Sequence, residues 1–564
     1  MTALPETPLD NWMPKLVLCL RQYTWQIFVK DLIAGLTVGL VALPLAMAFG
    51  IASGVTPQAG IYTAVVAGFL ISALGGSRVQ IGGPTGAFVV IVSGIVLKFG
   101  ISGLLMVTAM AGVLLLIMGA TGLGTAVRFI PRPVTIGFTN GIAVLIASTQ
   151  IRDFLGLKIG AVPSEFLARM EKLGAHLNTI DPVTAIVGGV SLGIILLWPL
   201  VTKRVPGSIV ALLAGTALAI LCKLPVETIG SKFGGIPTGL PAFHIPQFRA
   251  DLILPLLPSA MTVALLAAVE SLLSAVVADS MSGDKHNSNV ELIAQGIANV
   301  ISPMVGGLPA TGAIARTATN IRSGAKTPIS GVIHALTLLM ILLVAAPLAK
   351  FIPLATLAAV LFVVAYNMGE WREIGGILRL GRAERVVWVA TFGLTVVADL
   401  TVAVEVGMTL AALLYIYRVS QTTTIAPVTD AYIEKGRPHV LQGKDIPQFV
   451  TILRIHGPFL FGTTEKLADA TSDLSQYGHV VILRVRNMTA IDATGLYALE
   501  KLAERLHKTD RHVLVCGARR QPRTMLERAD FVSLIGQENI LPHIDAALAR
   551  ARILHHFPEK RMLA

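Results

Sequence analysis

The sequence has few charged residues and very little cysteine. Only 14% of its 564 residues are Asp, Glu, Lys or Arg, against about a quarter of an average soluble chain, and 54% are hydrophobic. This shortage excludes an ordinary soluble enzyme as the main part of the chain. The three cysteines, Cys19, Cys222 and Cys516, are isolated in the sequence, so we expect neither a disulfide framework nor a zinc site.

The sequence also lacks familiar catalytic motifs. Its twelve histidines are scattered and form no HExxH motif, and no P-loop lysine is present. We therefore predict that the protein is not an enzyme and holds no cofactor or metal. The net charge of +12 does not predict nucleic-acid binding either, because many basic residues fall in short loops between apolar runs.

Long apolar runs are what the chain has in abundance. They recur from about residue 31 to 418, as in LIAGLTVGLVALPLAMAFGIA (32–52), and at about twenty residues per crossing they predict roughly fourteen membrane spans. With an even count and a cytoplasmic N-terminus, the loops that fall inside carry basic residues such as Arg132 and Arg322, which is the positive-inside pattern. We expect a multi-pass protein of a bacterial inner membrane with both termini in the cytoplasm.

The hydrophobicity falls after Arg418, which indicates a change of domain. Beyond it, strand-like VTILRIHGPFLF (450–461) and HVVILRVR (479–486) alternate with helical segments such as ATGLYALEKLAERLHK (493–508), so a small α/β domain is predicted outside the membrane. The expected organisation is a cytoplasmic N-terminal segment (1–30), a transmembrane domain (31–420), a linker (421–449) and the small domain (450–556).

One Gly/Pro/Thr phrase occurs twice in the transmembrane domain. The first copy is QIGGPTGAFVVIV (80–92) and the second is VGGLPATGAIARTA (305–318). They fall early in the two halves of the domain, about 31–222 and 252–420. Seven spans in each half, an odd number, would make the copies cross in opposite senses, and such inverted repeats are typical of secondary transporters.

Each copy is a poor start for a full membrane helix, because Gly and Pro interrupt backbone hydrogen bonding and unpaired amides are costly in hydrocarbon. We interpret each as an extended segment that turns into a half-helix. Two helix N-termini facing one point would present positive partial charges, which predicts an anionic substrate. The alternative is that the glycines only allow ordinary helices to pack closely.

Two ionisable residues stand out in the apolar sequence. Arg316 lies one turn into the second half-helix and would add a full positive charge beside the anion; alternatively it pairs with a carboxylate or a backbone carbonyl. Glu270 lies about midway along an apolar span, with Ser274 one turn further on the same face. Glu270 could carry a coupling proton, could bind sodium together with Ser274, or could simply be the ion-pair partner of Arg316.

These segments resemble the sulfate permease (SulP) family, whose animal members form the solute carrier 26 group. The resemblance is carried by DLIAGLTVGLVALPLAMAFGIASGVTPQAGIYTA (31–64), GGSRVQIGGPTGAF (75–88), AAVESLLSAVVADSMSGDKHNSNVELIAQGIANVISP (267–303) and GGLPATGAIARTATNIRSGAKTPISGVIHA (306–335). The C-terminal domain resembles the STAS domain that these transporters share with anti-sigma-factor antagonists. The resemblance implies an all-α membrane domain of two inverted seven-span repeats, divided into core and gate parts, followed by a cytoplasmic α/β STAS domain.

The resemblance also implies a site and a mode of action. The third and tenth helices of the family supply the anion site, which corresponds here to Gly83, Pro84, Thr85, Gly86, Ala87, Phe88, Thr311, Gly312, Ala313, Ile314, Ala315 and Arg316. Glu270 occupies the family's acidic position in helix eight. The family members are usually homodimers whose core moves as an elevator, and the STAS domain could bind a cytoplasmic protein partner.

Two details of the resemblance bear on the substrate and the coupling ion. Some sodium-driven bicarbonate members have Asp followed four residues later by Thr, whereas this chain has Glu270 and Ser274, which favours a proton. The short segments PLAMA, GGSR, AFVVI and DFLGL are most similar to the corresponding segments of the family's proton-coupled C4-dicarboxylate transporters. Sulfate, a C4-dicarboxylate and bicarbonate all remain candidate substrates.

The C-terminal domain carries one candidate regulatory site. Asp492-Ala493-Thr494-Gly495 matches the turn that is phosphorylated in anti-sigma antagonists, so Thr494 is a candidate phosphosite, although Asp492 and Thr494 could simply cap the following helix.

The sequence therefore predicts a secondary transporter that imports a small anion, with protons as the coupling ion. The alternatives are a sodium-coupled bicarbonate transporter, an uncoupled channel-like mode, a nucleobase permease of similar architecture and a membrane anion sensor that signals through its STAS domain.

Overall fold

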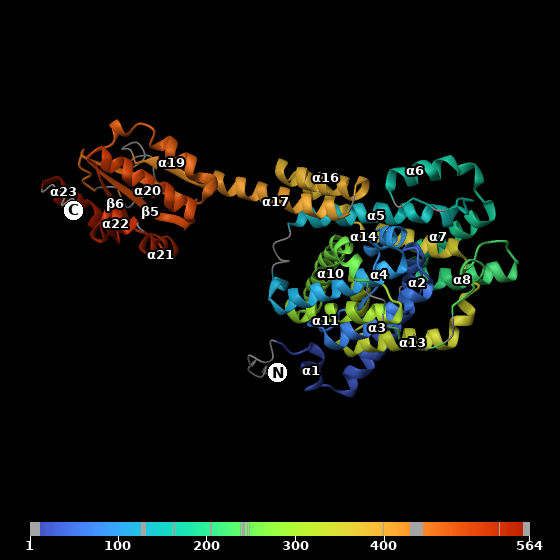
Figure 1. The fold of residues 1–564 in the computed structure, drawn as a ribbon. Helices are drawn as coiled ribbons and strands as arrows, with labels where there is room; N and C mark the ends of the chain where they lie inside the picture. Colours follow the sequence, from blue (N-terminus) through green and yellow to red (C-terminus); the bar gives the residue numbers. More distant parts are fainter. Residues whose placement is uncertain are drawn as a thin grey trace. The chain divides into compact units, whose positions relative to one another are not determined.

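The computed structural model describes residues 12–556 (Figure 1), apart from 126–130, 161, 164, 203–205, 237–238, 240–242, 245, 247–248, 399, 429–440, 442–443 and 530. It divides into two compact units, Met1–Thr409 and Leu410–Ala564. The first unit holds almost all of the apolar helices, and the second holds the five-stranded sheet.

The first half of the apolar unit is a series of helices interrupted by one short strand. Its elements are α1 (Lys15–Leu20), α2 (Trp25–Ala52), α3 (Pro57–Leu74), β1 (Gly82–Gly83), α4 (Phe88–Ala120), α5 (Arg132–Leu155), α6 (Phe166–Ala175), α7 (Pro182–Val201), α8 (Gly207–Leu221) and α9 (Ile229–Phe233).

The second half repeats this order, with its short strand again after the second long helix. Its elements are α10 (Ile253–Ser282), α11 (Ser288–Ile301), β2 (Thr311–Gly312), α12 (Ile314–Arg322), α13 (Ile329–Ala349), α14 (Leu354–Met368), α15 (Trp371–Arg379), α16 (Arg382–Val397) and α17 (Leu400–Thr422).

Fewer helices than expected are long enough to cross a membrane as single rods. Eight helices of the described residues have at least 18 residues and sufficient hydropathy. One of them, α4, is two segments joined at Gly100, whose φ of 71° is not helical. When α4 is counted as two segments, these eight helices give nine segments. The shorter helices α8, α11, α12 and α16, and the 23-residue α17, bring the total to fourteen, which is the number predicted. Two of these segments, α12 and the part of α4 before Gly100, are half-helices, while α8, α11 and α16 have 14 to 16 residues each.

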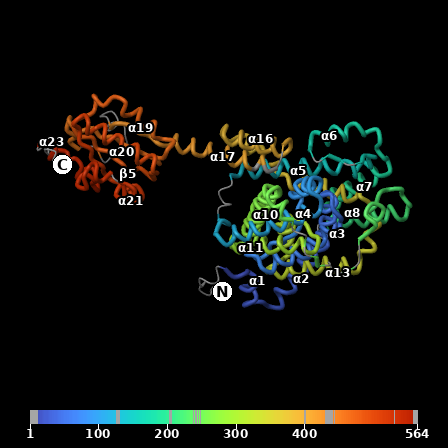
Figure 2. Tube along the Cα trace, viewed as in Figure 1, coloured from blue at the N-terminus to red at the C-terminus, as the bar shows by residue number. Residues whose placement is uncertain are grey.

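The helices of the apolar unit pack in two groups. The first group contains α2, α3, α4, α10, α11, α12 and α13, so it combines helices from both halves of the chain. The second contains α5, α7, α8, α14 and α16. Figure 2 shows the first group as blue, green and yellow tubes that lie side by side although they are distant in the sequence. These two groups correspond to the expected core and gate.

The strands β1 and β2 pair with each other inside the core group. They are antiparallel, with Gly82 opposite Gly312 and Gly83 opposite Thr311. The two copies of the Gly/Pro/Thr phrase therefore meet and run in opposite senses, as an inverted repeat requires.

The C-terminal unit is a small α/β domain. Its strands β3 (Thr424–Pro427), β4 (Val450–Phe459), β5 (Val480–Ile491), β6 (His512–Cys516) and β7 (Ile540–Leu541) form one sheet in that order, with β3 antiparallel and the rest parallel. Its helices are α19 (Thr464–Ala470), α20 (Ala493–Lys508), α21 (Arg520–Arg528), α22 (Phe531–Ile535) and α23 (Ile544–His556).

The α/β alternation of this unit agrees with the sequence prediction, with one difference. β3 lies within residues 421–449, which the sequence analysis treats as a linker, and it pairs with β4 as an edge strand. Residues 429–440 of that predicted linker lie outside the described residues.

Candidate anion-binding site

The site is built around the crossing of β1 and β2. The backbone N–H of Ala313 donates to the carbonyl of Ile81 at 2.8 Å, which extends the two-residue ladder toward α12. Gly83 has a φ of 145°, and a Cβ atom there would lie 2.7 Å from one terminal nitrogen of Arg316. Glycine is therefore required at this position both for its backbone conformation and for the close approach of the guanidinium.

The first half-helix begins directly after β1. The N–H groups of Phe88 and Val89 bond back to the carbonyls of Thr85 and Gly86 at 3.4 and 3.0 Å. The amides just ahead of Phe88, those of Gly86 and Ala87, consequently have no acceptor within α4. These two amides are the positive end of the half-helix.

The second half-helix has an equivalent start. Thr317 is the first residue of α12 whose N–H bonds within the helix, to Ala313 at 2.8 Å. The amides of Ile314 and Ala315 precede it, and the side chains of both residues are exposed, whereas Ala313 is buried. Both half-helices therefore begin at the β1–β2 crossing with amides that have no helical partner among the described residues, which agrees with the interpretation of the two phrases.

Arg316 brings a full positive charge to this crossing. Its side chain is only 3% exposed, and its guanidinium donates to the carbonyl of Pro84 in the opposite copy of the phrase. Its other terminal nitrogen has no hydrogen-bond partner among the described residues. Of the roles considered for Arg316, pairing with a backbone carbonyl is thus realised, and one N–H edge is left for a further acceptor.

Glu270 reaches the same crossing from α10. Its carboxylate accepts a hydrogen bond from the hydroxyl of Thr85 at 2.8 Å, and both side chains are half-buried. No ion pair within 4.0 Å joins Glu270 to Arg316 in the described part of the chain. Glu270 is therefore held by the first phrase rather than by the arginine.

Ser271, next to Glu270, fixes the second phrase. Its hydroxyl lies 2.6 Å from that of Thr311 and accepts from the N–H of Gly312 at 3.1 Å, while its carbonyl accepts from the side chain of Gln80 at 3.1 Å. One short stretch of α10 thus positions β1, β2 and the carboxylate together. The sequence analysis assigned no role to Ser271, which directly follows Glu270, or to Gln80, which is the first residue of the first phrase.

A second layer of buried polar side chains supports the crossing from behind. Asn299 pairs with the N–H and carbonyl of Ala310, at 2.8 Å each, and Asn320 donates to the carbonyl of Val79 at 2.9 Å. Thr317 accepts from the N–H of Ile81 at 3.0 Å. These bonds satisfy the backbone groups that the strands leave open inside an apolar bundle, where each orphaned group would be costly.

The predicted site residues differ in the exposure of their side chains. Gly83, Pro84, Gly86, Ala87, Phe88, Thr311, Gly312, Ala313 and Arg316 are buried. Thr85 and Glu270 are half-buried, and Ile314 and Ala315 are exposed. The accessible side of the crossing is therefore the one that carries the Glu270 carboxylate and the start of α12.

The two remaining residues of the predicted site have other neighbours. Ser274 is fully buried, and its hydroxyl lies 3.2 Å from that of Thr317. In the STAS domain Thr494 is exposed, and the carboxylate of Asp492 accepts from the N–H of Gly495 at 2.8 Å and from that of Phe461 at 3.0 Å. Asp492 is thus a helix cap, as the simpler interpretation of this turn held.

Gly86 places the first half-helix against the gate group. A Cβ atom on Gly86 would lie 2.9 Å from Ile146 of α5 and 3.5 Å from the sulfur of Met368 of α14. The core and gate groups are consequently in contact within one residue of Thr85.

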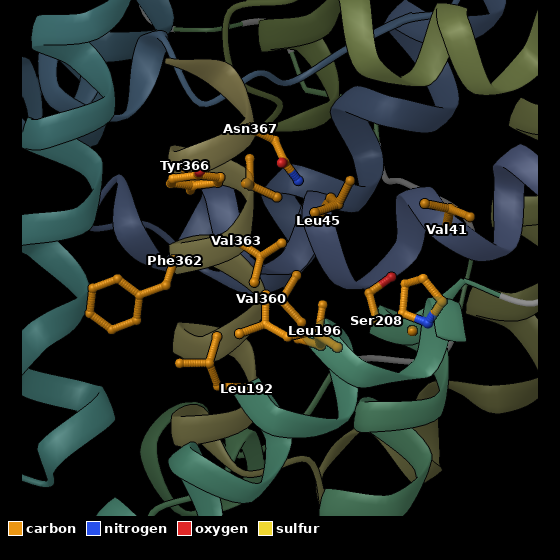
Figure 3. Close-up of a pocket in the computed structure, with 14 residues that line it drawn as sticks. Val41, Leu45, Leu192, Leu196, Ser208, Val360, Phe362, Val363, Tyr366 and Asn367 are labelled. Atoms are coloured by element: carbon orange, nitrogen blue, oxygen red, sulfur yellow. The ribbon is translucent and has the colours of Figure 1, made fainter. Parts of the chain in front are cut away.

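Large cavities elsewhere in the apolar unit have the wrong chemistry for an anion. One of about 760 Å³ lies between α2, α7, α8 and α14 (Figure 3), and none of the described residues that line it is charged. Its polar groups are those of Ser208, Tyr366 and Asn367, while side chains such as Leu45 and Val363 make up the rest. Another, of about 610 Å³, has Glu405 as the only charged residue among the described residues that line it. The β1–β2 crossing is the better candidate.

Comparison with known proteins identifies relatives of both units. Residues 28–391 match the Sulfate permease family, and residues 442–547 match the STAS domain. The chain is 42% identical over 528 residues to YvdB of Bacillus subtilis, a match that covers 93% of this chain and 98% of YvdB.

Two solved structures are similar. The transmembrane domain of a cyanobacterial bicarbonate transporter, BicA, is 35% identical with a TM-score of 0.62, covering 68% of this chain and 98% of BicA's domain. Murine solute carrier 26 family member A9, an anion transporter in its inward-facing state, shares the fold with a TM-score of 0.85 at 18% identity, covering 98% of this chain and 96% of that one.

Proposed function

Because this chain belongs to the sulfate permease family, we propose that it is a secondary active transporter that carries a small anion together with a proton. The observation that carries the proposal is the joint placement of Arg316, Glu270 and two half-helix N-termini at the β1–β2 crossing. Each of these features is expected at the centre of a secondary transporter built from inverted repeats.

The anion binds on the accessible side of the crossing. There the amides at the start of both half-helices offer hydrogen bonds, and their helix dipoles favour negative charge. Arg316 adds a full positive charge beside these amides. Its Nη1 atom has no hydrogen-bond partner among the described residues, so it can donate to the anion. In a water-poor site such charge-assisted bonds are strong.

Glu270 couples the anion to a proton. Its carboxylate, ionised, would repel an anion held within a few ångströms of Thr85, and protonation removes that repulsion. Anion binding and protonation of Glu270 therefore favour each other, and by thermodynamic linkage the effect is reciprocal. The carrier then crosses more readily with both bound than with either alone.

The substrate is a small oxyanion or carboxylate. The family name refers to sulfate, and BicA is named as a bicarbonate transporter. The similarity to the C4-dicarboxylate branch adds succinate and fumarate to the candidates. All of these are compact anions that can accept hydrogen bonds from two opposed sets of amides.

Transport proceeds by movement of the core group against the gate group. The half-helices and Glu270 all lie in the core group, so the whole site moves as one body past α5 and α14. We place both termini in the cytoplasm of a bacterial cell, the membrane part in the inner membrane, and the working unit as a homodimer whose STAS domains contact a cytoplasmic protein.

Uptake into proteoliposomes tests the proposal. Labelled sulfate, succinate and bicarbonate are offered with an inward proton gradient, an inward sodium gradient or neither. Proton-driven accumulation of one anion is expected. Glu270→Gln should abolish the response to the proton gradient, while Glu405→Gln, the same change in α17, should leave it intact. Accumulation that follows sodium alone, or a proton response that survives in Glu270→Gln, would overturn the coupling role.

A further inference from the structure

The short helix after α14 has three distinct faces. α15 (Trp371–Arg379) lies between α14 and α16, two of the segments counted as membrane spans. Residues three, four or seven positions apart share one face of a helix. Glu373 and Ile377 form the face toward the protein, because Ile377 is buried and the Glu373 carboxylate pairs with Arg132 of α5 at 2.8 Å.

The second face of α15 is apolar. It is formed by Trp371, Ile374 and Leu378, and the Leu378 side chain is 49% exposed. The indole N–H of Trp371 donates to the carbonyl of Tyr366 at 2.7 Å, which fixes the tryptophan beside the end of α14. A helix with Trp and Leu on one side and arginine on another is typical of the boundary between lipid and water.

The third face is basic and has a gap in its middle. Arg372, Gly375, Gly376 and Arg379 follow one another along it, and the arginines are two turns, about 10 Å, apart along the helix axis. Apart from the helix backbone itself, no atom lies within 4 Å of a Cβ atom added to either glycine. The two arginines therefore flank a stretch of open backbone.

The two glycines also make α15 a weak helix. No neighbouring atom requires a glycine at either position. Glycine is a poor helix former, and a helix of nine residues is marginal without support from its surroundings. A ligand that bridges Arg372 and Arg379 would therefore stabilise α15 across its weakest part.

The arginines of this face have no partner in the described part of the chain. Arg372 and Arg379 are exposed, and neither guanidinium forms an ion pair or a hydrogen bond with a described residue. The same holds for Arg382 and Arg385, which follow at the start of α16. Four arginines within fourteen residues are thus available to an external anion.

The acids of this segment do not cancel the arginines. Glu373 pairs with Arg132. Glu370 precedes Glu373 by three residues, so it belongs to the face toward the protein. Glu384 of α16 has an interaction partner of its own. The acidic and basic groups of α15 are therefore on different faces.

The order of the segments places α15 on the same side of the membrane as the N-terminus. With α4 counted as two, the segments that precede it are α2, α3, α4, α5, α7, α8, α10, α11, α12, α13 and α14, an even number. In the orientation proposed above this is the cytoplasmic side, where basic residues are enriched.

We propose that the basic face of α15 binds the phosphate group of an anionic phospholipid, such as phosphatidylglycerol, in the cytoplasmic leaflet. The guanidinium forks of Arg372 and Arg379 match the oxygens of a phosphate, and the open backbone at the glycines lets the headgroup approach. The acyl chains lie along the apolar face. This adjoining apolar face favours a lipid over a soluble phosphate, because both parts of a phospholipid then have a partner.

A lipid held by α15 would also fix the end of α14 that faces the transport site. Met368 lies three residues before Trp371, and its sulfur is 3.5 Å from a Cβ atom added to Gly86. The N–H of Glu370 donates to the side chain of Asn140 in α5 at 2.7 Å. The bound lipid would thus hold the gate group in place, a consequence that, unlike the binding itself, rests on the proposed movement of the core group.

Hydrogen–deuterium exchange on the full-length protein in nanodiscs tests the proposal. Nanodiscs of phosphatidylcholine alone are compared with nanodiscs that also contain phosphatidylglycerol, and the exchange of a peptide spanning residues 370–380 is followed. Phosphatidylglycerol should slow the exchange of the α15 amides several-fold. The measurement needs no transported anion, so its failure is distinguishable from failure of the proposed transport function.

Two double variants provide the comparison. Arg372→Gln combined with Arg379→Gln should abolish the effect of phosphatidylglycerol, whereas Arg520→Gln combined with Arg528→Gln, which removes two exposed arginines from α21 of the C-terminal unit, should retain it. Equal exchange in the two kinds of nanodisc, or an effect that survives in the α15 variant, would overturn the proposal. The same protection from inorganic phosphate in phosphatidylcholine nanodiscs would assign the site to a soluble anion and overturn the lipid.

Discussion

Gly312 and Gln80 are in direct contact across the β1–β2 crossing: a Cβ atom on Gly312 would lie 1.6 Å from the Nε2 atom of Gln80. That amide nitrogen in turn donates to the carbonyl of Ser271 in α10. Because Gly312 has no side chain, the side chain of Gln80 fits beside it and can donate to Ser271. This hydrogen bond links the first phrase to α10. A side chain at Gly312 therefore cannot be added without moving Gln80 of the first phrase.

Gly312→Ala should accordingly disrupt the site. The added methyl group must displace Gln80 or the strand, and overpacking of this kind costs about 1–3 kcal/mol. We expect a lower midpoint of thermal unfolding in detergent and loss of anion uptake. Gly94→Ala is the matched control, since no atom lies within 4 Å of its added Cβ, and it should behave like the wild type. Equal behaviour of the two variants would contradict the contact.

Thr85→Val should impair transport while leaving the protein folded. Valine has the shape of threonine but cannot donate to the Glu270 carboxylate, and a half-buried carboxylate that loses a donor is destabilised by about 1–3 kcal/mol. We expect uptake to fall by about tenfold, because 1.4 kcal/mol corresponds to a factor of ten. Thr85→Ser keeps the hydroxyl and should retain most of the activity. Similar rates for valine and serine variants would show that the hydrogen bond has no role.

Arg316→Lys should weaken anion binding although the charge is kept. Lysine has no planar fork, so it cannot both donate to the Pro84 carbonyl and present a second N–H edge. The KM for the transported anion should rise, with a larger rise or complete loss in Arg316→Gln. An unchanged KM in Arg316→Lys, measured by initial rates of uptake, would mean that only the net charge matters at this position.

The three cysteines should differ in reactivity. The thiolate is the reactive form, and burial raises the pKa of Cys516 to about 12 and raises that of Cys19, so both stay protonated at pH 8. Cys222 is exposed. A thiol-reactive maleimide should label one cysteine rapidly, and Cys222→Ser should abolish that labelling. Rapid labelling of Cys516 in the native protein would contradict its burial.

The doubled phrase made the centre of the fold predictable from the sequence. Gly, Pro and Thr in an apolar context indicate interrupted helices on local grounds, and their repetition at matching positions indicates that they meet. Both inferences depend only on backbone chemistry, and the antiparallel β1–β2 pair agrees with them. The family assignment is confirmed by the match over residues 28–391.

The hydrogen-bond network of buried polar side chains around the crossing could not be predicted from the sequence. Gln80, Asn299 and Asn320 are isolated polar residues in apolar surroundings, and the sequence does not say which distant backbone group each one satisfies. Asn320, for instance, serves Val79, 241 residues away. The sequence did not fix the position of the break in α4 at Gly100. It also assigned β3 to the linker, because four residues are too short to show a strand pattern.

The β1–β2 pairing also constrains how the protein is made. Gly82 is synthesised about 230 residues before its partner Gly312, a delay of roughly 10 to 50 seconds at ordinary rates of translation. Throughout that interval the first seven segments hold an interrupted helix whose backbone groups lack their native partners. The first half of the chain therefore cannot reach its final structure in the membrane by itself. Its unpaired backbone groups must be kept away from lipid by the insertion machinery until the second half has been synthesised.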